Sequence, residues 1–160
     1  MLYRRNLLFY DRQTFSLWSQ IGGMSVAGPL AGTHLQMLPA TETTWKDWQR
    51  RNPNTLVLSF QTGYRRNYGR DPYASFPLDR RPCLVVIVGG HAKIYPFSQL
   101  KKTRGEVKDS LGGRSFEVRF NRRNRTAHAT AEDAKPLAQF VSYLVDARAF
   151  YPRAPVFKAK

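Results

Sequence analysis

The sequence predicts an α+β fold, in which a mainly antiparallel β-sheet carries one short helix and one longer C-terminal helix. A hairpin-like stretch occurs twice, because Tyr10-Asp11-Arg12 is echoed by Phe120-Asn121-Arg122 about 110 positions later. Several short runs alternate apolar and polar residues or are apolar throughout, which is typical of strands. One stretch near the C-terminus carries apolar residues at helical spacing. Together these observations predict a degenerate duplicated hairpin–helix unit.

The repeat also predicts the domain organisation. We expect a single domain over residues 1–160, with an incomplete first repeat over about 1–60. A connecting loop follows over 61–81, and the second repeat occupies 82–160.

The first repeat opens with the earlier of the two hairpins. Its strands are expected at Leu7–Tyr10 and Phe15–Ser19, on either side of a polar turn. Trp18 is expected to lie in the core. After two glycines, Met24–Ala27 is expected to form a further short strand.

The short helix is expected to follow. Thr44 is a good N-cap, and Pro53 ends the helical pattern. Trp45 and Trp48 are three residues apart and therefore share one face. We expect this pair to anchor the helix to the sheet, with stacking on a ligand as the alternative. Leu56–Leu58 is expected to be the next strand.

The second repeat begins with the most apolar run of the chain. Leu84–Val88 is apolar at every position, which favours a central strand. His91–Tyr95 follows two glycines and is expected to be its hairpin partner. Ser115–Phe120 alternates apolar and polar residues, and Thr126–Thr130 completes the second copy of the hairpin.

The C-terminal helix is predicted from a cap and a periodic face. Asp133 can cap it, and Pro136 falls in the first turn, where proline is tolerated. The residues at helical spacing are Leu137, Phe140, Val141, Leu144, Val145 and Arg148. The helix also echoes the first one at an offset of about 99, because Trp45, Asp47, Pro53 and Val57 fall opposite Leu144, Asp146, Pro152 and Val156.

The composition limits the classes of partner. Lys and Arg total 26 against 11 Asp and Glu, so the net charge of +15 attracts any polyanion at low salt. Nucleic-acid binders, membrane-surface proteins and subunits that neutralise an acidic partner all share this property. Cys83 is the lone cysteine, which excludes an internal disulfide, and it is expected to pack as a small apolar side chain. No run approaches the roughly 20 apolar residues of a transmembrane helix.

The connecting loop mixes tyrosines and arginines among prolines and glycines. This composition is typical of surfaces that stack on bases and contact phosphates. The alternative is a surface loop held down by its tyrosines, with Asp71 pairing an arginine. The turn of the second hairpin adds further arginines. The residues expected to contact a partner are Tyr64, Arg65, Arg66, Tyr68, Arg70, Tyr73, Arg122, Arg123 and Arg125.

Catalytic and metal-binding patterns are weak. The three histidines stand far apart in the sequence: His34, His91 and His128. With one cysteine available, we expect no metal site and no cofactor. Ser16 or Ser19 could meet Asp11 and His128 if the repeat brings the two hairpins together, but no nucleophile-elbow pattern supports this. No catalytic residue is therefore assigned.

Long motifs carry a family resemblance. Residues 3–14 (Tyr-x-x-Asn-Leu-Leu-Phe-Tyr-Asp-Arg-Gln-Thr), 28–33 (Gly-Pro-Leu-Ala-Gly-Thr) and 43–48 (Thr-Thr-Trp-x-x-Trp) resemble the uncharacterised prokaryotic domain-of-unknown-function family three-one-seven-nine. Gly89–Pro96 continues the similarity. The resemblance implies little about activity. It implies a chain truncated at its N-terminus relative to longer, secreted or envelope-associated members.

Such a truncation would remove a neighbour of the first strand. We therefore expect Leu7–Tyr10 to present an open edge that a protein partner, a second copy of the chain or the Tyr64–Tyr73 loop covers. The localisation stays open, because the resemblance implies the envelope or secretion whereas the N-terminus carries no secretory signal.

The functional expectation is a non-catalytic binding or scaffold subunit that uses the Tyr/Arg loop and the open edge. The alternative is a protein that binds nucleic acid or another polyanion. A hydrolase with a Ser/His/Asp cluster is the residual hypothesis.

Overall fold

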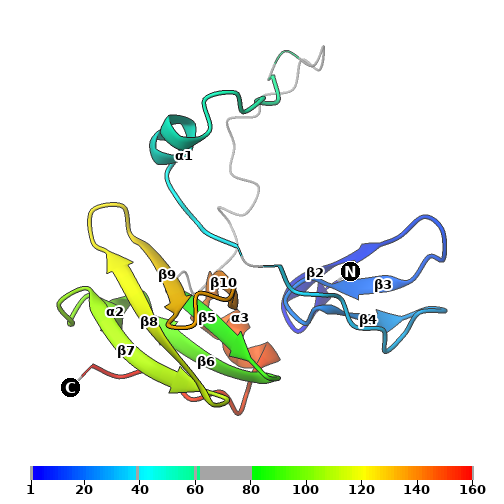
Figure 1. Ribbon diagram of the computed structural model, residues 1–160. Coiled ribbons are helices and arrows are strands. Elements are labelled where there is room, and N and C mark those ends of the chain that lie inside the picture. Colours follow the sequence, from blue (N-terminus) through cyan, green and yellow to red (C-terminus); the bar gives the residue numbers. More distant parts are fainter. Residues whose placement is uncertain (1, 39, 60, 62–80, 160) are drawn as a thin grey trace.

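The computed structural model describes residues 2–38, 40–59, 61 and 81–159. In this part of the chain, antiparallel strands form three sheets and are accompanied by three helices (Figure 1). The predicted α+β fold with mainly antiparallel strands is confirmed. Among the helices that are described, none combines the length and the apolar character that a membrane crossing requires.

A four-stranded sheet forms the N-terminal part, in the order β1-β2-β3-β4. Its strands are β1 (Leu2–Tyr3), β2 (Asn6–Tyr10), β3 (Leu17–Ser19) and β4 (Met24–Ala27). β2 and β3 form the expected hairpin, with Phe9 opposite Trp18. The expectation that Trp18 lies in the core is wrong, because this side chain is only half-buried. Its indole N–H donates to Asp11 at 2.8 Å, which gives the ring a polar partner.

The second half contains two three-stranded sheets, with the orders β10-β5-β6 and β7-β8-β9. The strands are β5 (Pro82–Val88), β6 (His91–Pro96), β7 (Glu106–Leu111), β8 (Arg114–Asn121), β9 (Thr126–Ala131) and β10 (Ala138–Tyr143). A short helix, α2 (Phe97–Leu100), follows β6. β5 is central in its sheet, as its apolar run predicts, and both expected hairpins of this half are present.

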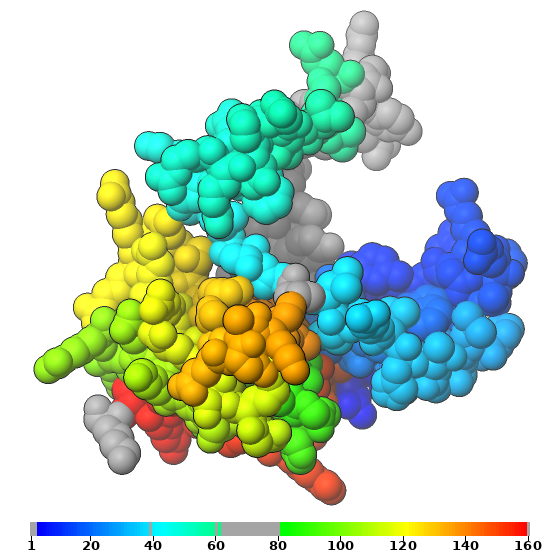
Figure 2. Space-filling view, in the orientation of Figure 1, coloured from blue at the N-terminus to red at the C-terminus, as the bar shows by residue number. Residues whose placement is uncertain are grey.

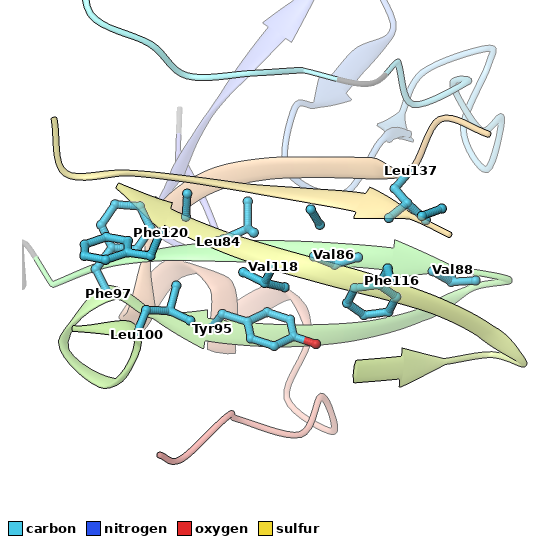
Figure 3. Close-up of a cluster of buried hydrophobic side chains, with 13 residues drawn as sticks. Leu84, Val86, Val88, Tyr95, Phe97, Leu100, Phe116, Val118, Phe120 and Leu137 are labelled. Atoms are coloured by element: carbon cyan, nitrogen blue, oxygen red, sulfur yellow. The ribbon is translucent and has the colours of Figure 1, made fainter. Parts of the chain in front are cut away.

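The main core lies between these two sheets (Figure 3). Leu84 and Val86 of β5 and Tyr95 of β6 pack with Phe116 and Val118 of β8, and each is at most 1% exposed. Burying a side chain of this size stabilises the fold by roughly 1.5–3 kcal/mol. The contact between the two sheets is therefore a main source of stability for this half.

The other face of β5 packs on α3 (Leu144–Phe150). Cys83, Val85 and Ala147 have no exposed surface there. Cys83 packs as a small apolar side chain, as expected. Burial, reinforced by the nearby Asp146 carboxylate, raises the pKa of the Cys83 thiol to about 12. The thiol therefore stays protonated and unreactive at neutral pH.

The predicted extent of the C-terminal helix is wrong. Ala138–Tyr143 forms strand β10, which pairs with β5 over six residue pairs, and the helix begins at Leu144. β10 has a different core on each face: Val141 packs on the main core and Phe140 on the cluster around α3. Apolar residues consequently fall at adjacent positions, and their spacing coincides with that of a helix.

Gln139 joins the two sheets of the second half. Its side chain is 2% exposed and reaches from β10 to the backbone of β9. The amide Nε2 donates to the carbonyl of Ala129 at 2.9 Å, and Oε1 accepts from the N–H of Ala129 at 2.7 Å. Both polar groups of the side chain and both backbone groups of Ala129 are thus satisfied inside the protein.

The short helix forms where it was predicted, but it is not anchored to a sheet. α1 (Trp45–Arg51) has Thr44 as its N-cap and contains no buried residue. Trp45 is 51% exposed and Trp48 is 42% exposed. Figure 2 shows α1 and the residues after it as a projection above the β8–β9 turn. Within the described residues Leu56–Leu58 forms no strand, which corrects a second expectation for this region.

The N-terminal sheet contacts the rest of the protein through α3 and the residue that follows it. The rings of Tyr3 and Phe150 meet edge to face, with their centroids 6.0 Å apart. Arg5 pairs with Asp146 at 3.6 Å, and the hydroxyl of Tyr151 donates to the carbonyl of Ile21 at 3.0 Å. The position of the first sheet therefore depends on a helix that β5 itself holds in place.

Replacing the bridging amide tests the link between the two sheets. Gln139→Leu keeps the size of the side chain but leaves the buried N–H and C=O of Ala129 without partners. We expect it to lower the free energy of unfolding by about 2–4 kcal/mol, measured by urea denaturation. Gln20→Leu, at an exposed position, is the control and should change the stability little. Equal stability of the two variants would show that the bridge contributes nothing.

Candidate functional site

The described arginines of the predicted contact set lie in the β8–β9 turn. Arg122, Arg123 and Arg125 are all exposed. The side chain of Asn121 holds the turn, because its Oδ1 accepts from the backbone N–H groups of Arg123 and Asn124, each at 3.0 Å. Arg122 donates to the carbonyl of Thr103, and Arg123 and Arg125 are exposed residues of the same turn. The turn thus presents positive charge at a fixed place.

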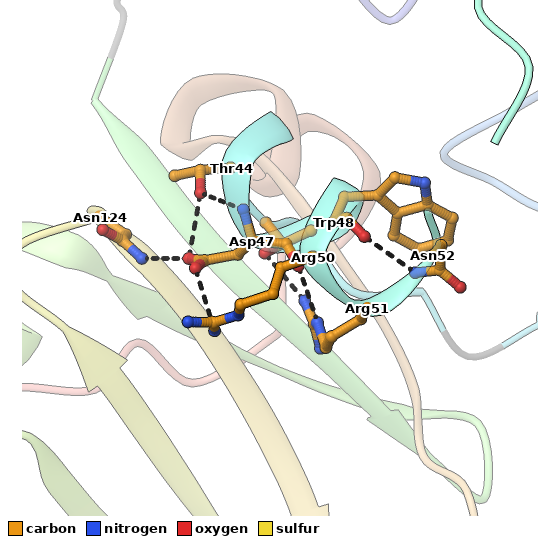
Figure 4. Close-up of polar contacts among 8 residues, drawn as sticks. Thr44, Asp47, Trp48, Arg50, Arg51, Asn52 and Asn124 are labelled. Atoms are coloured by element: carbon orange, nitrogen blue, oxygen red, sulfur yellow. Dashed lines mark hydrogen bonds and ion pairs between the residues drawn. The ribbon is translucent and has the colours of Figure 1, made fainter. Parts of the chain in front are cut away.

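The β8–β9 turn also touches α1 (Figure 4). The amide Nδ2 of Asn124 donates to the carboxylate of Asp47 at 2.7 Å. The same carboxylate accepts from the hydroxyl of Thr44 at 3.0 Å and pairs with Arg50 at 3.3 Å. This contact places the cations of α1 beside those of the turn. We call the result the basic surface, and its members are Lys46, Arg50, Arg51, Arg122, Arg123 and Arg125.

Sequence reasoning missed the α1 half of the basic surface. The spacing of charges in α1 indicated only a good match to the helix dipole. The contact that joins the two parts links residues 77 positions apart in the sequence. Neither Asp47 nor Asn124 belongs to a sequence motif from which this contact could be predicted. The remaining residues of the predicted contact set lie outside the described residues: Tyr64, Arg65, Arg66, Tyr68, Arg70 and Tyr73.

The residues of the residual hydrolase hypothesis are only partly brought together. Thr14 links Asp11 and Ser16, because its hydroxyl lies 2.8 Å from Asp11 Oδ2 and 2.7 Å from Ser16 Oγ. Ser16 has no exposed surface, and its Oγ also accepts from the N–H of Leu30. Ser19 is buried as well, and its hydroxyl accepts from a backbone N–H. These hydroxyls hold loops together and do not face solvent.

The fourth member of that hypothesis, His128, has a different neighbour. Its Nδ1 lies 3.3 Å from the hydroxyl of Thr41. Burial lowers the pKa of His128, so the ring is neutral near pH 7. A hollow of about 230 Å³ lies close by, and its lining is mostly apolar: Ala40, Thr41, Glu42, Leu84, Ala127, Phe140 and Val141. In the described part of the chain, no three His, Cys, Asp or Glu side chains are grouped as metal ligands.

The two hairpin turns share one geometry, as the repeat predicts. Asp11 Oδ1 accepts from the N–H groups of the residues two and three positions later, at 3.1 and 2.6 Å, as Asn121 does in its own turn. The last residue of each turn adopts a left-handed backbone conformation, with φ of 56° at Phe15 and 54° at Arg125. The prediction of a common turn is confirmed.

Asp11 makes more contacts than its counterpart Asn121. The indole of Trp18 donates to its second carboxylate oxygen, and the hydroxyl of Thr14 donates to both oxygens. These hydrogen bonds, of which that from Trp18 has the largest effect, lower the pKa of Asp11 to about 2. The carboxylate therefore stays ionised and fixes the turn at any pH above that value.

The outer edge of β2 differs from the matching edge of β8. Among the described residues, β1 pairs with β2 only at Asn6 and Leu7. β7 pairs with β8 over six residues, and the N–H of Phe120 then donates to Gly105 at 2.7 Å. In the described structure, the edge of β2 is thus open from Leu8 to Tyr10, whereas the expectation of an open edge is wrong at Leu7, which pairs with Leu2.

The open edge is rich in exposed apolar surface. Leu7, Phe9 and Tyr10 are 47%, 54% and 61% exposed. Phe120, which occupies the position of Tyr10 in the second hairpin, is only 5% exposed. A strand of this kind is a ready template for pairing with another chain.

A partly buried polar cluster lies where β6 meets β7. Asp109 accepts from the hydroxyl of Tyr95 at 2.8 Å and pairs with Lys93 at 2.7 Å. Burial would raise the pKa of Asp109, but the hydrogen bonds from Lys93 and Tyr95 outweigh it and hold this pKa below its usual value. The cluster ties the two sheets together at their rim. Sequence reasoning missed it because its members belong to different strands.

The comparisons with known proteins give one match. The family model described as "Protein of unknown function (DUF3179)" matches residues 1–150. Neither the comparison with curated proteins nor that with solved structures finds a match.

The contacts of Asp11 predict a graded response to substitution. Asp11→Asn keeps the acceptor for the turn N–H groups, as Asn121 does, but loses an acceptor for the Trp18 indole. Asp11→Ala loses both. We expect the melting temperature to fall in the order wild type, Asp11→Asn, Asp11→Ala, measured by circular dichroism.

The same carboxylate gives the sign of a pH effect. Its pKa is about 2 in the folded protein against 3.8 for an ordinary Asp, so its stabilising contribution is complete above pH 4 and is lost as the pH falls towards 2. The difference in stability between wild type and Asp11→Asn should shrink over that range. A constant difference would contradict the assignment.

Proposed function

The chain belongs to the DUF3179 family, and we propose that it is a non-catalytic binding or scaffold subunit whose N-terminal sheet takes up a strand of a protein partner. The observation that carries the proposal is the open edge of β2, which is flanked by exposed apolar side chains. The Tyr/Arg loop at 64–73 would contribute further contacts.

The direction of the backbone groups supports this proposal. The N–H of Asp11 donates to Ser16 and therefore points to the β3 side. Because backbone groups alternate between the two sides of an antiparallel strand, the N–H and C=O groups of Leu8 and Tyr10 point to the open side. An incoming strand would find two residues of unpaired backbone, and it would cover the side chains of Leu7 and Phe9.

The arrangement of the second hairpin supports it too. There β7 runs along the equivalent edge of β8, and the apolar residues of that strand, Phe116, Val118 and Phe120, are buried. The first hairpin has the same turn but a neighbour of only two residues. A partner strand at β2 would therefore reproduce a pairing that this chain already makes.

A non-catalytic role is supported by the placement of the candidate nucleophiles. Ser16 and Ser19 are buried and engaged in local hydrogen bonds, while His128 contacts Thr41. A general base must reach the group that it deprotonates. The proposal assigns these side chains to the support of the fold.

A peptide with the sequence Gly105–Leu111 is a direct probe of the edge, because it pairs with the matching edge of β8. We expect it to bind the protein saturably and to protect the amides of Leu8 and Tyr10 from hydrogen exchange. Tyr10→Pro removes one outward N–H without removing a bond to β3 and should abolish binding. The measurement is isothermal titration calorimetry combined with hydrogen exchange.

Tyr10→Ala is the matched control, because it removes the same side chain and keeps the N–H. It should bind the peptide within a few-fold of wild type. Equal binding by Tyr10→Pro, or no protection of the edge at saturating peptide, would contradict strand uptake at β2.

We also propose, as a second candidate, that the chain binds single-stranded nucleic acid or another polyanion. The observation that favours it is the contact between Asn124 and Asp47, which brings the cations of α1 to those of the β8–β9 turn. Trp45 and Trp48 add exposed aromatic rings to the same helix. Positive charge combined with stacking platforms is the usual composition of such surfaces.

Salt dependence tests this second candidate. A single-stranded DNA of about 30 nucleotides should lose roughly tenfold to hundredfold in affinity between about 50 and about 200 mM salt. Arg123→Glu should weaken binding and flatten that dependence, whereas Arg153→Glu, an exposed charge reversal outside the basic surface, should change it less. Fluorescence anisotropy is the measurement. Identical curves for both variants would remove the basic surface from consideration.

A further inference from the structure

α1 and the residues after it repeat the geometry of α3 and its tail. Both helices have seven residues, and they lie 99 positions apart. The N-cap residues, Thr44 and Tyr143, have φ and ψ of −73° and 151° and of −82° and 145°. The C-cap residues, Asn52 and Tyr151, have −133° and 68° and −122° and 64°. The two segments therefore enter and leave their helices in the same way.

The hydrogen bonds that follow the two helices also correspond. The N–H of Asn52 donates to Trp48 at 2.8 Å, and that of Tyr151 donates to Ala147 at 2.8 Å. Three residues later, Thr55 donates to Asn52 at 3.2 Å, as Ala154 does to Tyr151 at 3.0 Å. Position by position, Leu56–Leu58 is the counterpart of 155–157.

In the second repeat this tail docks on the β5–β6 hairpin. The N–H of Ile94 donates to the carbonyl of Pro155 at 3.0 Å, and the N–H of Phe157 donates to Ile94 at 2.8 Å. These bonds place Val156 in a parallel bridge with Ile94. The side chains at the helix face, among them Ala147, pack on the same hairpin. The helix α3 and the tail 155–157 thus both pack on the β5–β6 hairpin, and we call such a helix and tail together a clamp.

In the first repeat the same clamp is empty within the described structure. Leu56, Val57 and Leu58 are 97%, 66% and 87% exposed. Trp45 and Trp48, which stand at the positions of Leu144 and Ala147, are about half-exposed. Three consecutive apolar residues that belong to no strand of the described structure, next to two exposed indoles, form an apolar patch of the kind that marks an interaction site.

We propose that α1 and Leu56–Leu58 dock a β-hairpin from outside residues 1–160, of the apolar type that β5–β6 represents. The carbonyl of Leu56 and the N–H of Leu58 would bond the edge strand in parallel, as Pro155 and Phe157 do. Trp45 and Trp48 would cover the apolar face of that hairpin. This inference rests on the proposed binding role and names the class of partner, at a surface distinct from the edge of β2.

A second copy of the chain does not fit as the occupant. The edge of its own β6 at Ile94 is already paired with its own tail. A copy could offer this hairpin only by giving up the contacts that bury Val156 and Ala147. A polypeptide whose hairpin has a free edge meets no such cost.

The probe for this proposal is the hairpin itself, residues 82–96 with Cys83→Ser, fused to a soluble carrier domain. The full chain should bind it saturably, with protection of the Leu58 amide from exchange and a change in tryptophan fluorescence. Leu58→Pro removes the N–H that the docked strand would accept and should weaken binding at least tenfold. Leu58→Ala keeps the N–H and should stay within about threefold of wild type.

The β2 variant separates this proposal from the proposed function. Tyr10→Pro should bind the hairpin as wild type does, even if it has lost the Gly105–Leu111 peptide. A hairpin that binds Leu58→Pro and Leu58→Ala equally would overturn the inference and leave the β2 proposal intact. Protection of Leu58 by single-stranded DNA, or concentration-dependent dimerisation that Leu58→Pro abolishes, would overturn it in favour of a different occupant.

The second repeat provides an internal check of the pairing. Phe157→Pro removes the corresponding N–H from a clamp that is already filled, whereas Phe157→Leu keeps it. The proline variant should melt at least about 3 °C below the leucine variant. Equal melting temperatures would show that tail pairing carries no weight and would remove the basis of the inference.

Discussion

The fold depends on the burial of β5 on both of its faces. Leu84 and Val86 face the β7-β8-β9 sheet, while Cys83 and Val85 face α3. A strand has only two faces, so this burial requires a layer on each side. The hairpin with β6 and the pairing with β10 complete the sheet. The helix, both sheets of the second half and the C-terminal tail are therefore all defined relative to this strand.

The N-terminal sheet is attached to β5 indirectly, through α3. It meets α3 through an aromatic pair, an ion pair and a hydrogen bond to Tyr151, and α3 is itself held by β5. The attachment uses Tyr3 but not Leu7, Phe9 or Tyr10, whose side chains remain at the surface. The second half thus supplies the stability that allows the first half to expose apolar surface, which is the usual relation between a scaffold and a binding element.

The sequence predicted correctly those features that depend on residues close together in the chain. The β5–β6 hairpin follows from an apolar run and two glycines, and the common turn follows from Asp11 and Asn121. The predictions from the sequence were wrong where contacts between distant segments determine the structure. β10 packs against a core on each face and so lacks the two-residue period of a strand, and its buried amide, Gln139, is satisfied by the backbone of β9. The contact between α1 and the β8–β9 turn could not be predicted from the sequence either, because it is a side-chain hydrogen bond between distant segments.

The two repeats separate what local sequence determines from what packing determines. The backbone conformations of the helix caps, the turn conformations and the hydrogen bonds after each helix agree between the copies. They agree although only Thr44 caps its helix with a side chain, and although α3 is packed on a hairpin while α1 has no buried residue. The local geometry of this unit therefore does not require its packing surface. A segment that already has its bound conformation loses less conformational entropy when a partner arrives. For the proposed docking, the exposed copy is for this reason better suited than a segment that would have to fold on contact.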